Sequence, residues 1–312
     1  MRVSVVMCTY DPAIENHLRA AVESLFAQTY DDIELILVVD GDAELCERAI
    51  ETYEFHDECV VICNATNRGI SASRNRGLGV ATGEVIAFMD DDAVADPDWI
   101  TELVRTYTET DAIAVGGRMT PIWLTRRPRM LPDEFLWLVG VNDRGFAEPG
   151  AEIRNTFGSN LSVKREVLAE LGGFEPSVGT HHRRSLQAEE AELGSRLRAS
   201  FGRGVRYNPD ARVGHKVFPH RTELTWLLAR CFWQGYSKAL VTHRGPATGK
   251  PERAFLRRLL RESTPRRGKQ LVRSPSINTT LELAAIVLFT AAVGAGYTAA
   301  IALEWIGSVS RQ

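Results

Sequence analysis

Residues 87–93 read Ala-Phe-Met-Asp-Asp-Asp-Ala, so an apolar segment ends abruptly in three carboxylates. Residues 85–89 predict a buried strand, which places Asp90, Asp91 and Asp92 at the edge of a sheet. Three adjacent carboxylates repel one another unless a cation or strong hydrogen-bond donors lie nearby. Oxygen ligands of this kind suit Mg2+ or Mn2+, and such ions commonly bind together with substrate phosphates. Taken alone, the triplet is equally compatible with a solvated acidic turn before a helix.

Short apolar segments alternate with helical patterns around this strand. Strands are predicted at residues 3–7, 33–39 and 60–62, with amphipathic helices between them. This alternation is typical of an α/β fold whose parallel sheet is covered by helices on both faces. Ligands bind such sheets beyond the carboxyl ends of the strands. Thr9, Asp40 and the aspartate triplet all follow strands in this way, which is the first functional signal.

A segment rich in small residues precedes the aspartate triplet. Residues 67–77 contain Gly69, two serines and Arg74 at the predicted start of a helix. Small residues allow the backbone to approach a ligand, and the free amides of a helix start attract anions. Arg74 adds a planar cation that suits a phosphate. The segment alone is also compatible with a solvated helix start, and it lacks the G-x-G-x-x-G spacing of nicotinamide-binding proteins.

Together these positions resemble a known family. Thr9-Tyr10, Asp40, Asn67-x-Gly69, Arg74-Asn75 and the Asp90/Asp92 pair occur in the order and spacing of inverting family 2 glycosyltransferases. The resemblance covers about residues 1–220. It implies the GT-A nucleotide-sugar-binding fold, which has a Rossmann-like, mostly parallel sheet, and a UDP-sugar donor. One departure is that Asp40-Gly41-Asp42 stands where the family often has paired acids.

The resemblance also implies a role for each matching residue. Asp40 would accept a hydrogen bond from uracil, with Thr9 and Tyr10 close to the base and Arg74 beside the nucleotide. Asp90 and Asp92 would hold the ribose and the metal on the diphosphate, with Mn2+ or Mg2+ as the cofactor. The nucleotide-sugar site predicted in this way consists of Thr9, Tyr10, Asp40, Asn67, Gly69, Arg74, Asp90 and Asp91.

A second acidic cluster supplies the candidate catalytic base. Inverting transfer needs a carboxylate that removes a proton from the acceptor hydroxyl. The family places an acid pair before a helix with the pattern acid-Leu-x-x-Arg, and the second acid is usually the base. Glu192-Leu193 and Arg196 match that helix, so the pair corresponds to Glu189 and Glu190. We predict Glu190 as the base, with Glu189 as the second candidate, although the family usually has an aspartate there.

Two basic segments flank this acidic cluster. The loop His181-His182-Arg183-Arg184 is compatible with binding a donor carboxylate, a diphosphate or a lipid phosphate, and equally with a solvated surface. His215 resembles a late histidine that some family members place against the metal or the diphosphate. We therefore predict Asp92, Asp90 and His215 as metal ligands, and imidazole suits Mn2+ better than Mg2+.

The C-terminal third indicates a membrane. A Trp-rich helical pattern at residues 226–240 is compatible with a bilayer interface or with packing onto the catalytic domain. Residues 253–273 carry eight lysines and arginines against Glu262 alone, a composition that attracts anionic lipids. Residues 283–303 contain no charge, and about 20 apolar residues can cross a bilayer. We predict a basic juxtamembrane region at 221–275 and a transmembrane helix at 281–303, with a buried amphipathic helix as the alternative.

The composition and the cysteines of the chain indicate its cellular compartment. The chain has 312 residues, 44% of them hydrophobic, and a net charge of −3 that argues neither for nor against nucleic acid. We expect no nucleic-acid partner for a transferase of this kind. Cys59 and Cys63 are predicted to be buried thiols rather than metal ligands, and the chain opens on a strand without a secretory signal. A reducing cytosol is therefore expected for most of the protein.

The combined prediction is a membrane-tethered, metal-dependent inverting glycosyltransferase at the cytoplasmic face of the cell membrane. Residues 112–117, 155–160 and 232–238 resemble archaeal family members of N-glycan assembly. That resemblance implies glucuronate from UDP-glucuronate as the donor group and a dolichyl- or polyprenyl-phosphate-linked sugar as the acceptor. Arg118, Arg183 and Arg184 are candidates for binding the donor carboxylate. The alternatives are a polyprenyl-phosphate sugar synthase with a lipid phosphate acceptor, and a non-catalytic membrane adaptor on a degenerate transferase fold.

Overall fold

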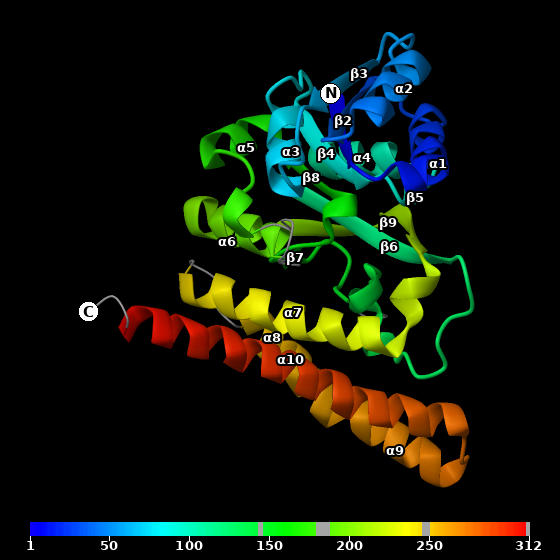
Figure 1. Cartoon of the computed structure of the whole chain (residues 1–312), viewed down its shortest axis with the longest axis vertical. Helices are drawn as coiled ribbons and strands as arrows, with labels where there is room; N and C mark the ends of the chain where they lie inside the picture. Colours follow the sequence, from blue (N-terminus) through cyan, green and yellow to red (C-terminus); the bar gives the residue numbers. More distant parts are fainter. Residues whose placement is uncertain (143–145, 179–187, 245–249, 310–312) are drawn as a thin grey trace. The chain divides into compact units, whose positions relative to one another are not determined.

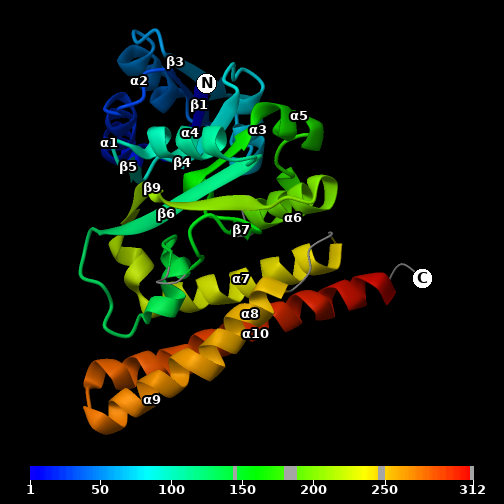
Figure 2. The ribbon, with the colours of Figure 1, turned by 180° about the vertical axis from the view of Figure 1, so that it is seen from behind.

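The structure, a computed structural model, describes residues 1–142, 146–178, 188–244 and 250–309 (Figures 1 and 2). The chain forms two compact units. Unit 1 comprises Met1–Pro121, Ala147–Ser185 and Glu189–Lys216, and unit 2 comprises Ile122–Phe146, Leu186–Ala188 and Val217–Gln312. The basic loop His181-His182-Arg183-Arg184 lies outside the described residues.

Unit 1 begins with the parallel strands that the sequence predicts. They are β1 (Val3–Thr9), β2 (Ile33–Asp40), β3 (Cys59–Asn64) and β4 (Val85–Asp90), in the spatial order β3-β2-β1-β4. The helices that follow β1, β2 and β3 are α1 (Glu15–Phe26), α2 (Ala43–Tyr53) and α3 (Ile70–Leu78).

Alternate side chains of these strands enter two separate cores. Val5 and Leu37 pack in one core with residues of α1 and α2, whereas Val6 and Ile36 pack in the other. This division follows from the two-residue repeat of a strand, which points successive side chains to opposite faces of the sheet. Both faces are covered, which explains why the strands read as continuous apolar runs.

The second half of the sheet is antiparallel. β8 (Leu161–Lys164) pairs with β4, and β6 (Ala114–Trp123) pairs with β8. Further along, β9 (Val205–Val217) pairs with the short strands β5 (Ala93–Ala95) and β7 (Glu152–Ile153). The predicted α/β fold is confirmed, but the sheet is mixed, because the first four strands pair in parallel whereas β8 pairs antiparallel with both β4 and β6. The helices of this half are α4 (Trp99–Glu109), α5 (Arg165–Leu171) and α6 (Glu189–Phe201).

One cysteine prediction is wrong. Cys63 at the end of β3 is bonded through its sulfur to Cys46 of α2, and their Cα atoms are 6.0 Å apart. Cys59 is a buried free thiol, as expected. Proximity between Cys46 and Cys63 arises from packing of α2 against β3, which no local pattern in the sequence reveals.

Unit 2 is helical. Its elements are a 3-10 helix η2 (Asp133–Val139), α7 (Leu224–Arg244), α8 (Lys250–Arg258), a π-helical turn (Leu259–Ser263), α9 (Thr264–Arg273) and α10 (Ile277–Val309). Its core surrounds Phe135 of η2 and Phe289 of α10, whose ring centroids lie 5.4 Å apart. Among the described residues, Ile277–Leu303 is the one helical segment long and apolar enough to cross a membrane, with 22% of its most apolar window buried.

Asn160 joins the antiparallel strands of unit 1 to α4. Its side-chain oxygen accepts hydrogen bonds from the Trp99 indole N–H at 2.9 Å and the Gly117 amide at 3.2 Å. Its side-chain nitrogen donates to the carbonyls of Ala211 at 2.9 Å and Arg118 at 3.2 Å. Asn160 is fully buried, so water cannot replace these partners.

Substitution of Asn160 by alanine should lower the free energy of unfolding by about 3 kcal/mol, because buried donors and acceptors lose their partners. Urea denaturation measures the change. Asn16→Ala, at an exposed position in α1, is the control and should stay within about 0.5 kcal/mol of the wild type. Equal stability of the two variants would contradict the assigned role of Asn160.

Candidate active site

The carboxyl ends of the parallel strands gather the predicted site residues in unit 1. Cys8 of β1 is aligned with Asp90 of β4, so the triplet begins beside the end of β1. Thr9 is buried at that end, close to the Asp91 carboxylate. Tyr10 follows with its ring exposed on the rim. The structure thus brings together residues that lie up to about eighty positions apart in the sequence.

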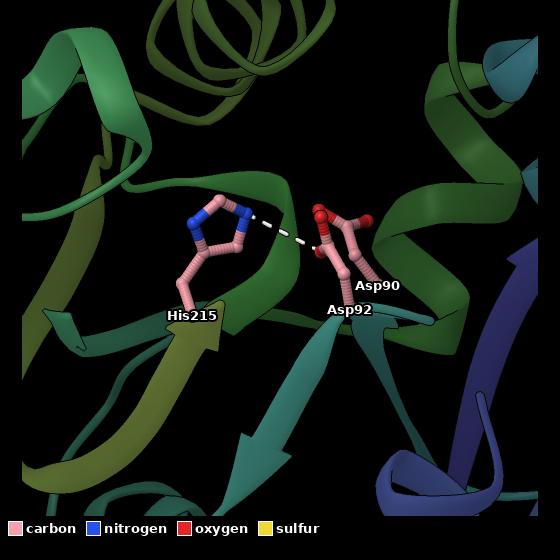
Figure 3. A group of neighbouring side chains, drawn as sticks. All are labelled: Asp90, Asp92 and His215. Carbon is pink, nitrogen blue, oxygen red and sulfur yellow. Dashed lines mark ion pairs between the residues drawn. The ribbon is translucent and has the colours of Figure 1, made fainter. Parts of the chain in front are cut away.

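Strand pairing completes a candidate metal site. β9 runs antiparallel to β5, and this register aligns His215 with Ala93, the residue after the triplet. The Nε2 of His215 lies 3.3 Å from the Oδ1 of Asp92, and both side chains are buried. Asp90, Asp92 and His215 each offer a ligand atom within 4.8 Å of the others, and Figure 3 shows the three side chains converging. Two carboxylates and an imidazole at this spacing fit a divalent cation such as Mn2+.

Asp91 and Lys216 add two further ionisable groups to this edge of the sheet. Burial, followed by the charges of Asp92 and Asp90, raises the pKa of Asp91 to about 8. Lys216 is buried beside these acids and donates through Nζ to the His17 carbonyl at 3.2 Å. Burial lowers the pKa of Lys216, while Asp92 and Asp91 oppose that shift. In the sequence, only the position of Lys216 next to His215 indicates that it belongs to this edge of the sheet.

Asp40 shapes the start of α3. Its carboxylate accepts from the Asn64 side-chain amide at 2.7 Å and from the backbone amides of Arg68 and Gly69, both at 2.9 Å. Asn67 also accepts from the Gly69 amide, at 3.2 Å. Gly69 has φ +84°, a conformation that favours glycine. These contacts explain the Asn67-x-Gly69 spacing, and the part of Asp40 in binding uracil stays a prediction.

Arg74 connects the two acidic groups. Its side chain is 4% exposed, and it donates to the Asp90 Oδ1 at 3.0 Å and to the Glu190 Oε1 at 3.4 Å. The guanidinium also lies over the rings of Phe88 and Phe174, 5.8 Å and 5.3 Å from their centroids. Burial alone would lower the pKa of Arg74, but the neighbouring carboxylates raise it above its ordinary value. Arg74 is therefore a fixed cation between the candidate metal site and the candidate base.

The two candidate bases occupy different environments at the start of α6. Glu189 is buried, and burial together with the charge of Glu190 raises its pKa to about 8. Both effects favour the protonated form of Glu189. Glu190 has a partly exposed side chain, 17% accessible, and forms the ion pair with Arg74. Of the two, Glu190 has the more accessible carboxylate.

The position of α6 is set by two side chains from the family-like motifs. Arg196 pairs with Glu192 at 2.7 Å and donates to the carbonyls of Leu171 and Gly173, each at 2.8 Å. Asn75 accepts from the amide of Phe174 and donates to its carbonyl, both at 2.7 Å. Residues 171–174 are thereby tied to both α3 and α6, and Glu190 of α6 lies opposite Arg74.

Much of the chain matches one known protein family. Residues 4–172 match the model of the family described as glycosyl transferase family 2. The chain belongs to glycosyltransferase family 2. It is 46% identical over 298 residues to the glucosyl-dolichyl phosphate glucuronosyltransferase of Haloferax volcanii, with 95% of each chain covered. It is also 29% identical over 244 residues to the succinoglycan biosynthesis protein ExoM of Rhizobium meliloti, covering 75% of this chain and 73% of ExoM. Family and relatives make the chain a hexosyltransferase.

Solved structures of low sequence identity share the fold of this family 2 chain. The mannosyltransferase PcManGT from Pyrobaculum calidifontis, in complex with GDP-Man and Mn2+, has 21% identity and a TM-score of 0.58, and covers 99% of this chain and 79% of its own. TarS of S. aureus, in complex with UDP-GlcNAc, has 16% identity and a TM-score of 0.57, with 94% and 82% covered. These similarities confirm the GT-A fold that the sequence predicts.

A methyl group at Gly158 should disrupt the contact between Arg74 and Glu190. A Cβ at this position would collide with the Glu190 Oε1 and with the Arg74 guanidinium. We expect Gly158→Ala to lower the rate of sugar transfer by about 100-fold, since small displacements of reacting groups have effects of this size. Gly268→Ala, where a Cβ meets open space, is the matched control and should retain the wild-type rate. A Gly158→Ala variant with full activity would show that this contact is dispensable.

Proposed function

We propose that this family 2 hexosyltransferase moves glucuronate from UDP-glucuronate, with inversion, onto a dolichyl- or polyprenyl-phosphate-linked sugar. One observation carries the proposal: the buried Arg74 bonds Asp90 of the candidate metal site and Glu190 at the start of α6. A site for a diphosphate-bound cation and a site for a base are thus fixed relative to each other. The relative from Haloferax volcanii, similar over nearly the whole chain, supports the choice of donor and acceptor.

The proposed mechanism assigns each group a step. Glu190 removes the proton of the acceptor hydroxyl as that oxygen attacks the anomeric carbon. The protonated Glu189 adds no second negative charge beside it. Asp90, Asp92 and His215 would hold Mn2+ or Mg2+, which when bound neutralises charge on the departing diphosphate. Lys216 contributes a further positive charge on the same side, next to Asp92.

Recognition of the nucleotide sugar would draw on the strand ends. A uridine is proposed to bind near the end of β1 and the start of α3. The residues proposed to surround it are Thr9, Tyr10, Asp40, Asn67 and Gly69. The donor carboxylate needs a cation, and Arg118 of β6 has an exposed side chain. Arg183 and Arg184, the other candidates, lie outside the described residues.

Membrane association is proposed from the C-terminal region. We propose a catalytic domain at residues 1–220, a basic juxtamembrane region at 221–275 and a membrane-embedded apolar helix at 281–303. The basic residues before this helix would be attracted to the anionic lipids of the cytoplasmic leaflet, which supports a catalytic domain on the cytoplasmic face of the cell membrane. A membrane-bound acceptor is consistent with this arrangement, because tethering raises the effective concentration of enzyme and acceptor.

Donor and metal can be tested together. Membranes that contain the protein should transfer glucuronate from UDP-glucuronate to a glucosylated polyprenyl phosphate, and EDTA should abolish transfer until Mn2+ or Mg2+ is added. UDP-glucose and UDP-N-acetylglucosamine serve as comparison donors in the same assay. Turnover of a neutral sugar alone would reject the uronate, and failure of every donor to bind would favour a non-catalytic adaptor.

Paired substitutions test the base. Glu190→Gln should abolish transfer, a loss of 1000-fold or more, while donor affinity stays unchanged, because only proton removal is lost. Glu189→Gln reproduces the shape of the protonated acid and should keep turnover within about tenfold of the wild type at pH 7. Single-turnover kinetics and calorimetric titration with UDP measure the two quantities. An active Glu190→Gln enzyme would favour a lipid phosphate acceptor, which is already an anion and needs no base.

A further inference from the structure

The apolar helix α10 has two different faces. Its inner face is buried in the core of unit 2, through side chains that include Ala285, Ile286 and Phe289. Between residues 277 and 302 its outer face is exposed and carries no charge; it includes Leu281, Ala284, Leu288, Ala295 and Ala302. These positions lie three, four or seven residues apart, as on one side of a helix. The apolar residues on one side of α10 therefore pack against protein, and those on the other side form an uncharged surface.

The part of unit 2 that covers the inner face of α10 is not suited to the interior of a bilayer. Phe289 packs on Phe135 of the 3-10 helix η2, and Val141, which follows η2 outside any helix, belongs to the same core. Irregular backbone of this kind is not found in contact with lipid in the hydrocarbon layer, because its polar groups would lack partners. At the start of α10, Glu282 bonds the buried Arg267 at 2.7 Å, and Arg267 bonds Glu134 at 2.7 Å.

α7 packs so closely on α10 that the two helices must occupy the same environment. A Cβ at Gly235 of α7 would collide with the carbonyl of Val293, and a Cβ at Gly296 of α10 would collide with that of Phe232. The two helices lie side by side in both views of the chain (Figures 1 and 2). α7 carries Arg230 and Lys238, which lie over the rings of Trp226 and Trp137. If α10 crossed the bilayer, these charges would enter the hydrocarbon layer with it, at high cost.

A basic groove lies on the helix next to α10. It has a volume of about 520 Å³ and is lined by Arg261, Arg266, Lys269 and Arg273, with Glu262 as the one acid. The exposed apolar residues Leu260 and Val272 occur in the same segment. Cationic and apolar side chains together are typical of surfaces that bind anionic lipid headgroups.

We propose that unit 2 is a monotopic anchor for an anionic bilayer, in which α10 lies along the membrane surface instead of crossing it. The uncharged outer face enters the outer part of the acyl layer, and the basic groove binds lipid phosphate. The inner face stays on the protein core, so η2, α7 and the ion pairs remain outside the hydrocarbon. This inference extends the membrane association of the proposed function, and it does not depend on the sugar that is transferred.

The depth of α10 in lipid tests the proposal without any activity assay. Leu281, Leu288, Ala295 and Ala302 are exposed and seven residues apart, so single cysteines there share one face. Each is labelled with a fluorophore in the full chain on vesicles containing phosphatidylglycerol, and quenched by lipids that carry a quencher at known depths. We expect equal, shallow depths at all four positions. A spanning helix would place them over about 32 Å, with Leu288 and Ala295 deepest, and would overturn the proposal.

Two controls accompany the depth measurement. Ala285→Cys, on the buried inner face, should resist labelling in the folded chain, whereas the neighbouring Ala284→Cys on the outer face should react. Rapid labelling of both would mean that α10 does not pack on the core as described, which also contradicts the proposal.

The groove is tested by vesicle sedimentation. Lys269→Gln with Arg273→Gln should weaken binding to phosphatidylglycerol vesicles by about 30-fold, as expected for two lost basic contacts. Arg253→Gln with Arg257→Gln removes the same charge from the same segment outside the groove, and should have a clearly smaller effect. Equal losses in the two double variants would show diffuse attraction and reject a lipid phosphate site in the groove.

Discussion

The buried guanidinium of Arg74 is the interaction on which the active-site geometry depends. It lies between Asp90 and Glu190, over two aromatic rings, and almost inaccessible to water. Removing one partner would leave the charge of the buried guanidinium less well compensated, so the surrounding structure must keep all three groups in place. Gly158 leaves room for the contact, and Asn75 fixes the backbone of Phe174 below it. The backbone at Gly158 and Phe174 therefore supports the contact of Arg74 with Asp90 and Glu190.

The mixed sheet brings the functional groups to one edge. The parallel strands end at Thr9, Asp40 and Asp90, as expected for an α/β sheet. The antiparallel strand β9 then returns across the sheet and places His215 and Lys216 beside the aspartates. A purely parallel sheet would supply the acids alone. The return of β9 adds an imidazole and an ammonium group, which makes the edge suited to both a cation and a diphosphate.

Unit 2 shows why hydropathy does not determine membrane topology. The same apolar composition suits a helix that crosses a bilayer, a helix buried in protein, and a helix with one face in each environment. The contacts of α10 with η2 and α7 show that one of its faces is buried in protein. Its inner face is occupied by protein that carries charges and irregular backbone, and only its outer face is available to lipid.

The sequence by itself determined the α/β class, the first four strands, the aspartate triplet and the family, because these depend on local periodicity and on motif spacing. It also identified His215, Arg74 and the glutamate pair as candidates. Tertiary structure decided what the sequence left open: the antiparallel half of the sheet, the bond between Cys46 and Cys63, the pairing of Arg74 with two acids, and the different burial of Glu189 and Glu190. These features arise from contacts between residues far apart in the chain, and burial and pairing of that kind leave no local pattern.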